Sequence, residues 1–495
     1  MTEERASYRR ILKSSSIIGG ATFATILVGL VKMKVFALLL GPEGVGLFGV
    51  YAVLLALMTA FVGMGLNSSG VRELAVLTEK PEEMDRARWS LWLLTFALAI
   101  GGAFLVLLLH APIAKFTSGE GAPFSATPWI ALCVAISVVQ ATQMVVLQAF
   151  QRVASVARVS FYAAILSAAA GIAAVALLGQ SGVLIALLAA PLAGMLVAFL
   201  ERRHLPPLGP RPPGRAVMFG HWRTLLKLGG AFVVTVMMHR AAEFAIRAII
   251  VRKEGLEGAG LYQAAVSISG NNVGLLLSAL GAAYFPQLSA LIGDRERAQE
   301  FLNQQVRVML LISGPLLIGL VGGAPLALQI LFSSKFVAGT SLLQFQAAGD
   351  ALKLMSFALV YVMIVKGDSF RFTLIEGSFA AIAVTLCFVF SEYLGMEAYG
   401  IAWLCTNLIY TGLLIYACRK RHGIKVAGGN FRLLGCYILV CLVLIAVGSQ
   451  SWVAALLLGG LASASAAAFS FHQLTLVSGT DRGSLLNRLR AGFRR

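Results

Sequence analysis

The chain has 495 residues, of which 58% are hydrophobic and only 13% are charged. A soluble protein carries about 25% charged residues, so this composition excludes a soluble globular protein and indicates a membrane protein. The net charge of +18 could suggest nucleic-acid binding. However, the basic residues gather in short segments between apolar stretches, which is the distribution of cytoplasmic loops.

Apolar stretches long enough to cross a membrane follow one another along the chain. Fourteen spans are predicted, at 11–40, 45–69, 89–110, 127–150, 158–178, 183–200, 224–250, 261–285, 305–332, 342–365, 372–392, 399–418, 432–448 and 452–472. The predicted fold is therefore all-α, a polytopic membrane protein with about 14 transmembrane helices.

The positions of lysine and arginine predict the orientation of these spans. With the N-terminus in the cytoplasm, most of the 40 basic residues fall in cytoplasmic segments, including the stretch 202–215 and the tail from 481. The predicted outside loops contain only Lys115, Arg252, Lys253 and Lys335. Both termini are therefore predicted to be cytoplasmic.

The sequence also contains an internal repeat. EGVGLF at 43–48, before span 2, returns as EGAGLY at 257–262, before span 8, which is 214 residues further along. A weaker echo links SGVLIALL at 181–188 with YGIAWLCT at 399–406. Such a repeat predicts two pseudo-symmetric six-helix lobes in the same orientation, a design common in alternating-access transporters.

The predicted domain boundaries follow from this repeat. They are an N-terminal lobe at 1–205, a Pro-rich cytoplasmic linker at 206–222, a C-terminal lobe at 223–420, and a two-helix hairpin with a basic cytoplasmic tail at 421–495.

Charged residues inside the spans are the candidates for function, because a charge near the bilayer centre costs about 2.5–3.5 kcal/mol on insertion scales. The five cations are Lys32, Lys34, Arg240, Arg247 and Lys353, and the three acids are Glu243, Asp350 and Glu376. A surplus of positive charge favours an anionic cargo such as a phosphate or pyrophosphate headgroup.

Span 7 places Arg240, Glu243 and Arg247 on one helical stripe. Either the stripe faces a hydrated cavity as a cationic site, or Glu243 pairs with one arginine and has a structural role. Lys34 lies nine residues before Glu43, and Arg247 lies ten residues before Glu257. Because the two positions nearly match in the repeat, Lys34 and Arg247 are predicted to share a site. Lys32 lies about 200° round the helix from Lys34 and cannot face the same cavity, although either lysine could reach the outer interface.

Spans 8, 10 and 11 supply the other candidates. Asp350 and Lys353 share a helix face and can form a structural ion pair. Alternatively, the pair breaks and releases a charge when the cavity changes shape. Glu376 is a candidate proton carrier. Gln263, Ser267 and Asn271 could either bind a sugar or hold helices together by hydrogen bonds.

The catalytic and cofactor motifs that were sought do not occur in the sequence. It has no P-loop, no H-E-x-x-H and no G-x-S-x-G, and its six cysteines show no C-x-x-C spacing. No enzyme activity, cofactor or metal is therefore expected.

Three stretches resemble the Wzx-type polysaccharide flippases of the multidrug/oligosaccharidyl-lipid/polysaccharide (MOP) exporter superfamily. They are GPEGVGLFGVYAVLLALMTAFVGMGLNSSGVREL (41–74), EGAGLYQAAVSIS (257–269) and SSKFVAGTSLLQFQAAGDALKLM (333–355). The resemblance covers about residues 11–420, so spans 13 and 14 exceed the twelve helices common in those flippases.

The resemblance implies an inner-membrane transporter that flips undecaprenyl-pyrophosphate-linked oligosaccharide by alternating access, without ATP. It also implies that charged residues recur in the family at Lys34, Arg247, Asp350, Lys353, Lys366, Arg371 and Glu376. The expected partners are this lipid-linked oligosaccharide, the bilayer and the glycan polymerase and chain-length machinery, with no nucleic acid, and the protein is expected to be a monomer. The alternatives are a drug or cation antiporter of the same fold and, third, a membrane glycan polymerase or ligase.

Overall fold

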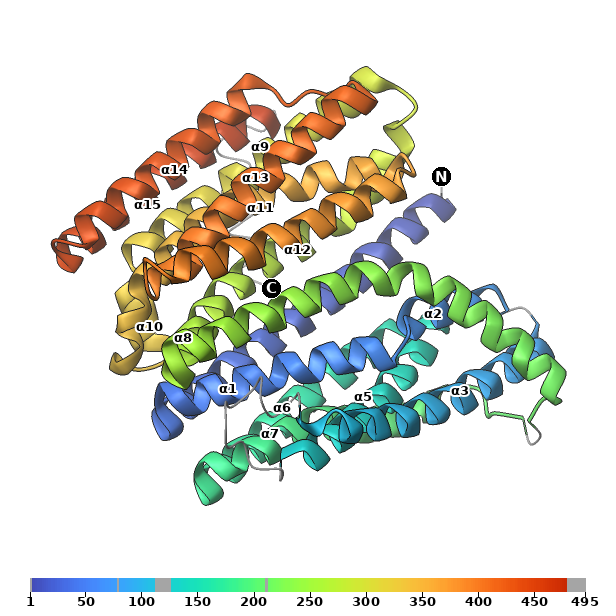
Figure 1. Ribbon diagram of the computed structural model, residues 1–495. Coiled ribbons are helices and arrows are strands. Elements are labelled where there is room, and N and C mark those ends of the chain that lie inside the picture. Colours follow the sequence, from blue (N-terminus) through green and yellow to red (C-terminus); the bar gives the residue numbers. More distant parts are fainter. Residues whose placement is uncertain (1, 78–79, 112–125, 210–211, 479–495) are drawn as a thin grey trace. The chain divides into compact units, whose positions relative to one another are not determined.

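The computed structural model describes residues 2–77, 80–111, 126–209 and 212–478, and within these ranges the regular structure is helical. The long helices, shown in Figure 1, are α1 (Thr2–Val62), α3 (Pro81–Leu108), α5 (Ala126–Ala149), α6 (Val153–Leu178), α7 (Gly182–Glu201), α8 (Arg215–Leu291), α9 (Arg295–Gly322), α11 (Thr340–Val365), α12 (Ser369–Ser391), α13 (Glu397–His422), α14 (Gly428–Gly448) and α15 (Trp452–Ser478). The short helices α2 (Leu66–Val76) and α10 (Ala324–Leu331) follow α1 and α9.

Each of the fourteen predicted spans coincides with a helical segment. Ten helical stretches of the described residues are long and apolar enough to cross a membrane by length and composition. Two of them, Gly19–Val62 and Val153–His204, each contain two predicted spans, and the kinked helix α8 contains spans 7 and 8. The all-α polytopic fold is therefore confirmed.

Single glycines replace the loops expected after spans 1 and 7. α1 is interrupted only by Gly41 (φ 67°, ψ −168°), and α8 only by Gly255 (φ 72°, ψ −171°). Glycine adopts a positive φ without the steric penalty that a Cβ atom brings, so each helix can bend at one residue. The two glycines are 214 residues apart, as the repeated motifs are, so the repeat is present in the backbone as well as in the sequence.

Some predicted boundaries differ from the structure. The helix of span 2 ends at Val62, and GLNSSG lies at the start of α2 after Gly65 (φ 73°). Span 9 is divided into α9 and α10, and residues 215–222 of the predicted linker already belong to α8. Arg211, Lys115 and the tail from 481 lie outside the described residues.

The chain divides into two compact units. The first comprises residues up to Gln263 together with Leu331–Phe336, and the second comprises Ala264–Ile330 and the chain from Val337 onward. These units differ from the predicted lobes, which stay a prediction.

Contacts at the start of α8 explain why its first segment belongs to the first unit. His221 lies 2.5 Å from the Glu73 carboxylate of α2. Trp222 Nε1 donates to the backbone oxygen of Ser90 in α3 at 2.8 Å. These contacts attach the α8 N-terminus to the α2–α3 region. In this first unit α6 packs on α7 and α1, and α5 packs on α3 and α7.

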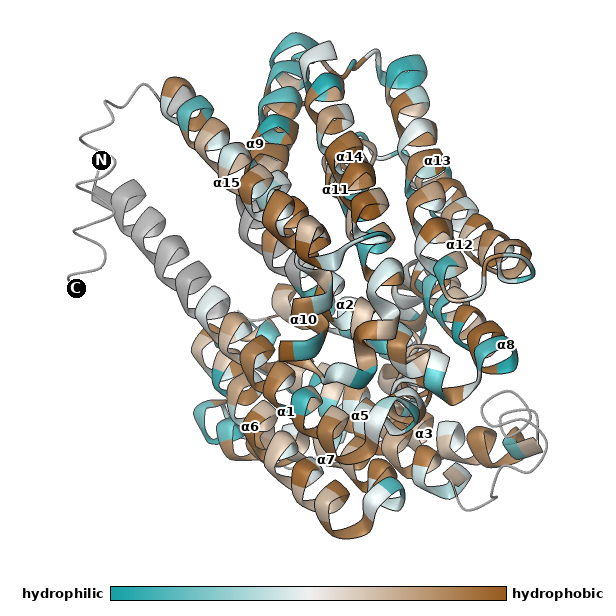
Figure 2. Ribbon diagram, turned by 90° about the vertical axis from the view of Figure 1, so that its left-hand side faces the viewer, coloured by the Kyte–Doolittle hydropathy of each residue, from teal (hydrophilic) through white to brown (hydrophobic). Residues whose placement is uncertain are grey.

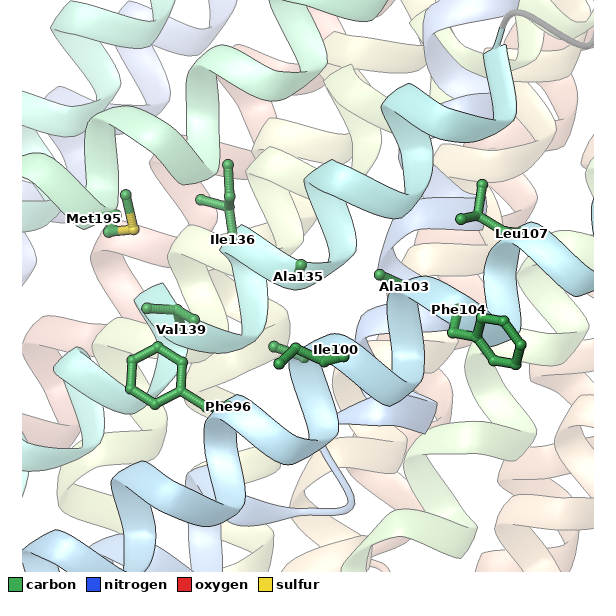
Figure 3. A pocket seen from close by; sticks show the side chains of 10 residues that line it. Phe96, Ile100, Ala103, Phe104, Leu107, Ala135, Ile136, Val139 and Met195 are labelled. Carbon is green, nitrogen blue, oxygen red and sulfur yellow. The ribbon is translucent and has the colours of Figure 1, made fainter.

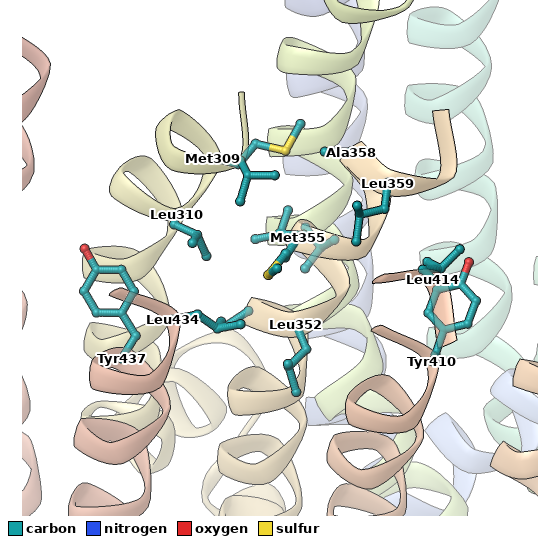
Figure 4. Close-up of a cluster of buried hydrophobic side chains, with 14 of the residues drawn as sticks. Met309, Leu310, Leu352, Met355, Ala358, Leu359, Tyr410, Leu414, Leu434 and Tyr437 are labelled. Atoms are coloured by element: carbon teal, nitrogen blue, oxygen red, sulfur yellow. The ribbon is translucent and has the colours of Figure 1, made fainter. Parts of the chain in front are cut away.

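The core of the second unit is built around α11, which contacts α9, α12, α13 and α14. Figure 4 shows side chains of this core, among them Met309, Leu352, Met355 and Leu414. The α14–α15 hairpin packs closely on α9, because a Cβ atom at Gly322 would lie 2.6 Å from Gly459 Cα. Figure 2 shows hydrophobic residues along the long helices and hydrophilic residues near the ends of α9 and α13, as in membrane-spanning helices.

Candidate functional site

The two repeats meet in the first unit at a pair of glycines. A Cβ atom at Gly46 would lie 2.0 Å from the Leu256 carbonyl oxygen, and one at Gly260 would lie 1.9 Å from the Pro42 carbonyl oxygen. These contacts are reciprocal, because Gly46 and Gly260, like Pro42 and Leu256, are 214 residues apart. The helices that follow the two kinks therefore cross in backbone contact, which requires glycine at both positions.

A cation packs on an aromatic ring on each side of this crossing. The guanidinium carbon of Arg247 lies 5.4 Å from the centroid of the Tyr262 ring. The Lys32 ammonium lies 4.9 Å from the centroid of the Phe48 ring. Phe48 and Tyr262 are equivalent in the repeat, and each lies two residues after its crossing glycine. One cation–π pair from each repeat thus flanks the Gly46–Gly260 crossing.

These contacts favour Lys32, rather than the predicted Lys34, as the counterpart of Arg247. Lys32 and Lys34 precede Gly41 by nine and seven residues, and Arg247 precedes Gly255 by eight, so sequence spacing cannot choose between them. The ring contact identifies Lys32 as the counterpart of Arg247, because Lys32 packs on Phe48, the residue equivalent to Tyr262. Lys34 is also partly buried on α1, and its convergence with Arg247 stays a prediction.

Arg247 is the buried cation of this region. Arg247 is only 6% exposed. Its Nε and Nη1 atoms have no hydrogen-bond partner in the described part of the protein. Because an unsatisfied buried charge is costly, such a group is retained mainly where a ligand or a conformational change uses it.

The acid of the span 7 stripe forms its ion pair with Arg240 rather than with Arg247. Glu243 forms an ion pair with Arg240 at 2.8 Å, and both side chains are about half exposed (50% and 43%). Among the described residues, no carboxylate lies within ion-pair distance of Arg247. The stripe therefore contains the ion pair of the structural alternative, whereas a hydrated cavity facing Arg247 stays a prediction.

Of the three predicted polar ligands, only Gln263 lies in the first unit. Its amide packs against Gly49, since a Cβ atom there would lie 2.7 Å from Gln263 Oε1. Ser267 and Asn271 lie further along α8 in the second unit and are partly buried. A substrate contact for these three residues stays a prediction.

In the second unit, Trp403 separates Asp350 from Lys353. Asp350 is 1% exposed and accepts hydrogen bonds from the Ser269 hydroxyl and from Trp403 Nε1, the latter at 3.0 Å. The Lys353 ammonium lies 4.7 Å from the centroid of the Trp403 indole. The direct Asp350–Lys353 pair that the spacing allows is not formed among the described residues, because the indole of α13 binds both groups.

Glu376 is buried, as predicted, and has an aromatic partner. It is 8% exposed and accepts a hydrogen bond from the Tyr410 hydroxyl. Phe379 packs edge-on against both Tyr410 and Trp403, at centroid distances of 4.9 and 5.9 Å. An aromatic series thus connects the environments of the two buried acids of the second unit.

The predictions missed the aromatic partners of the charged residues. Tyr262 stands in EGAGLY and Trp403 in YGIAWLCT, so the repeat motifs themselves contained the signal. Tyr410 follows Trp403 by two helical turns, and no pattern in the sequence distinguishes it.

Lys366 and Arg371 stabilise the turn between α11 and α12. Lys366 Nζ donates to the Ile292 carbonyl oxygen at 2.8 Å, and Arg371 Nη1 donates to Asp368 at 3.0 Å. The hydrogen bond from Arg371, helped by neighbouring basic side chains, holds the pKa of Asp368 below its usual value. These two cations are therefore engaged by the turn in this structure.

The helix arrangement defines the class of the protein. A solved structure of the lipid II flippase MurJ in an inward closed conformation superposes with a TM-score of 0.73, at 13% identity, covering 92% of this chain and 98% of that one. An inward-facing multidrug resistance transporter of the MATE family superposes with a TM-score of 0.66, at 16% identity, covering 83% of this chain and 97% of that one. The protein thus shares its fold with these two solved transporters.

Sequence comparison then gives the family. The model of a family described as polysaccharide biosynthesis proteins matches residues 35–340, more than half of the chain, and the chain belongs to this family. The lipid III flippase of Escherichia coli (strain K12) is 23% identical over 421 residues, covering 81% of this chain and 97% of the relative. The resemblance to polysaccharide flippases is therefore confirmed.

Proposed function

We propose that the protein is a flippase that moves undecaprenyl-pyrophosphate-linked oligosaccharide from the cytoplasmic to the periplasmic leaflet of the bacterial inner membrane by alternating access. The observation that carries this proposal is Arg247, a buried guanidinium with two nitrogen atoms that have no hydrogen-bond acceptor among the described residues. Guanidinium groups bind phosphate oxygens in a two-pronged, charge-assisted geometry. A pyrophosphate headgroup would supply the acceptors that these two nitrogen atoms do not find among the described residues.

The charges of the two units support an anion rather than a cation as the cargo. In the first unit, no carboxylate of the described residues lies within ion-pair distance of the buried cation Arg247. In the second unit the buried acids Asp350 and Glu376 already accept hydrogen bonds from protein donors. A drug or cation antiporter would need an acid available to its substrate, so this pattern disfavours that alternative.

The remaining candidate residues have supporting roles in this proposal. Lys32, Lys34 and Arg240 would add positive charge in the first unit and Lys353 in the second, while Gln263, Ser267 and Asn271 would offer hydrogen bonds to sugars. Glu243, Asp350 and Glu376 act as ion-pair or coupling groups. The six-helix lobes at 1–205 and 223–420 are the repeating parts of this transporter.

Two relatives support lipid-linked glycan as the cargo. The curated relative is a lipid III flippase, and the superposed MurJ structure is a lipid II flippase. Both are transporters rather than enzymes, which argues against a membrane polymerase or ligase. The substrate and the bilayer are accordingly the proposed partners.

Complementation of a flippase-deficient strain tests the proposal. We expect the wild-type chain to restore glycan export and Arg247→Gln to abolish it, with Lys34→Ala and Lys32→Gln also impaired. Lys253→Gln, at an exposed position near the end of the same helix segment, is the matched control and should export normally. Normal export by Arg247→Gln, at equal membrane abundance, would remove the anion-site proposal.

A further inference from the structure

Two cavities of the first unit lie along the same three helices, α3, α5 and α7. The first has a volume of about 300 Å³ and is lined by Arg88, Trp92, Gln143, Arg202 and Leu205, with the start of the Pro-rich segment beside them. The second has a volume of about 470 Å³, and its side chains are shown in Figure 3. They are apolar and include Phe96, Ile100, Ala103, Ala135, Val139 and Met195.

We infer that the two cavities are parts of one groove, because their lining residues continue the same faces of α3 and α5. On α3 the lining residues are Arg88, Trp92, Phe96, Ile100, Ala103 and Leu107, at intervals of three or four. The same intervals join Leu147, Gln143, Val139 and Ile136 on α5. Residues at such intervals lie on one side of a helix. The groove therefore has a polar end and an apolar body.

The polar end is cationic and contains a buried donor. Arg88 is 6% exposed, and its Nη1 atom contacts Asp85 at 3.3 Å and the Pro206 carbonyl oxygen at 3.1 Å. Its Nε atom has no hydrogen-bond partner within the described residues. Arg202 lines the same cavity and packs on Phe199. With two guanidinium groups and one carboxylate, this end favours an anion.

The body of the groove is open to the bilayer and long. Phe96, Ile100 and Phe104 are 50%, 72% and 61% exposed, so the apolar side chains face the lipid. The rise of α3 from Arg88 to Leu107 is about 29 Å, whereas one leaflet has an apolar depth of about 15 Å. A chain that fills the groove is therefore longer than the acyl chain of a phospholipid in one leaflet.

We propose that this groove binds the phosphate-bearing end and the chain of a polyisoprenoid lipid, at a site separate from Arg247. Arg88 and Arg202 bind the phosphate, and the face from Phe96 to Leu107 binds the isoprenoid chain. The proposal rests on the proposed function in one respect, since a flippase of lipid-linked glycan meets such a lipid as its cargo. The groove would hold the lipid at the end of the bundle that is predicted to face the cytoplasm.

Native mass spectrometry of the purified full chain in detergent tests this site. The probes are undecaprenyl phosphate, farnesyl phosphate and phosphatidylglycerol. We expect the wild type to retain undecaprenyl phosphate, and to bind the short prenyl phosphate and the phospholipid at least about tenfold more weakly. Equal retention of phosphatidylglycerol would overturn the proposal and show an ordinary phospholipid site.

Matched pairs of variants test whether the lipid binds in the groove or elsewhere on the protein surface. Ala103→Phe fills the groove, whereas Ala97→Phe adds the same ring to an exposed position of α3 that does not line it. Arg202→Gln removes a lining charge, and Arg203→Gln removes its exposed neighbour. We expect Ala103→Phe and Arg202→Gln each to weaken binding about tenfold, the scale of one charge-assisted or well-packed contact. Equal binding by Ala103→Phe and Ala97→Phe would contradict the proposal.

Failure of this proposal can be distinguished from failure of the transport proposal. Arg247→Gln should keep the groove-bound lipid, because its side chain does not line the groove. If complementation succeeds while undecaprenyl phosphate binds all groove variants equally, only the groove proposal falls. If the wild-type chain binds undecaprenyl phosphate and Ala103→Phe weakens this binding, but the wild-type chain does not restore export, the groove proposal stands and the transport proposal falls.

Discussion

Replacing Gly46 by alanine should force apart the crossing of the two repeats. The added Cβ atom would lie 2.0 Å from the Leu256 carbonyl oxygen, about 1.5 Å closer than a comfortable contact. The obstacle is backbone on both sides, so no side-chain rotation relieves it. Overpacking of this kind costs about 1–3 kcal/mol in unfolding free energy. Alanine has a higher helix propensity than glycine, which offsets up to about 1 kcal/mol of this cost. With the full propensity gain of about 1 kcal/mol subtracted, we expect a net destabilisation of up to about 2 kcal/mol.

Thermal or denaturant unfolding of the purified protein in detergent measures this effect. Gly101→Ala is the matched control, because a Cβ atom at Gly101 on α3 would meet nothing within 4 Å. That variant should be neutral or slightly stabilised, so the two substitutions have opposite signs. Gly260→Ala should match Gly46→Ala, and the double variant should cost less than the sum, because separating the helices at this one crossing accommodates both added methyl groups. Stability of Gly46→Ala equal to that of Gly101→Ala would refute the close crossing.

Two further predictions concern the second unit and the orientation. Trp403→Phe keeps a ring for Lys353 but removes the donor to buried Asp350, so we expect a loss of about 1–3 kcal/mol in unfolding free energy. An unchanged unfolding midpoint would show that another donor replaces the indole. For orientation, cysteines introduced at Lys335 and at Arg297, in a background without other reactive cysteines, should react with impermeant reagent from opposite sides of the membrane. Labelling from the same side would overturn the predicted topology.

The repeat is the feature that sequence predicted best. Hydropathy located most of the helical segments, because a membrane helix must be long and apolar enough to span the bilayer, as ten stretches of the described residues are. The offset between EGVGLF and EGAGLY also matches the offset between the kinks at Gly41 and Gly255. The sequence did not show that the connection after span 1 and the connection after span 7 each consist of a single residue. That outcome depends on a positive φ, which glycine permits but does not require.

The contacts of the charged residues could not be derived from spacing. Lys32 and Lys34 point to different sides of α1, and only the position of Phe48 across the kink identifies the one that packs on the ring. Spacing likewise allowed Asp350 to pair with Lys353, whereas the indole of Trp403 enters from another helix and binds both. Helical periodicity fixes which residues share a face, and the partner of that face is set by tertiary packing.

Flipping in proteoliposomes tests the central claim, that buried Arg247 binds the anionic headgroup of the cargo. The measurement is the rate at which a fluorescent undecaprenyl-pyrophosphate oligosaccharide crosses the bilayer, for wild type, Arg247→Lys and Arg247→Gln. Loss of a charge-assisted hydrogen bond costs about 1.5–3 kcal/mol, so we expect Arg247→Gln to be slower by about tenfold or more. Arg247→Lys, which keeps the charge without the two-pronged geometry, should be intermediate. Wild-type flipping by Arg247→Gln would contradict the claim.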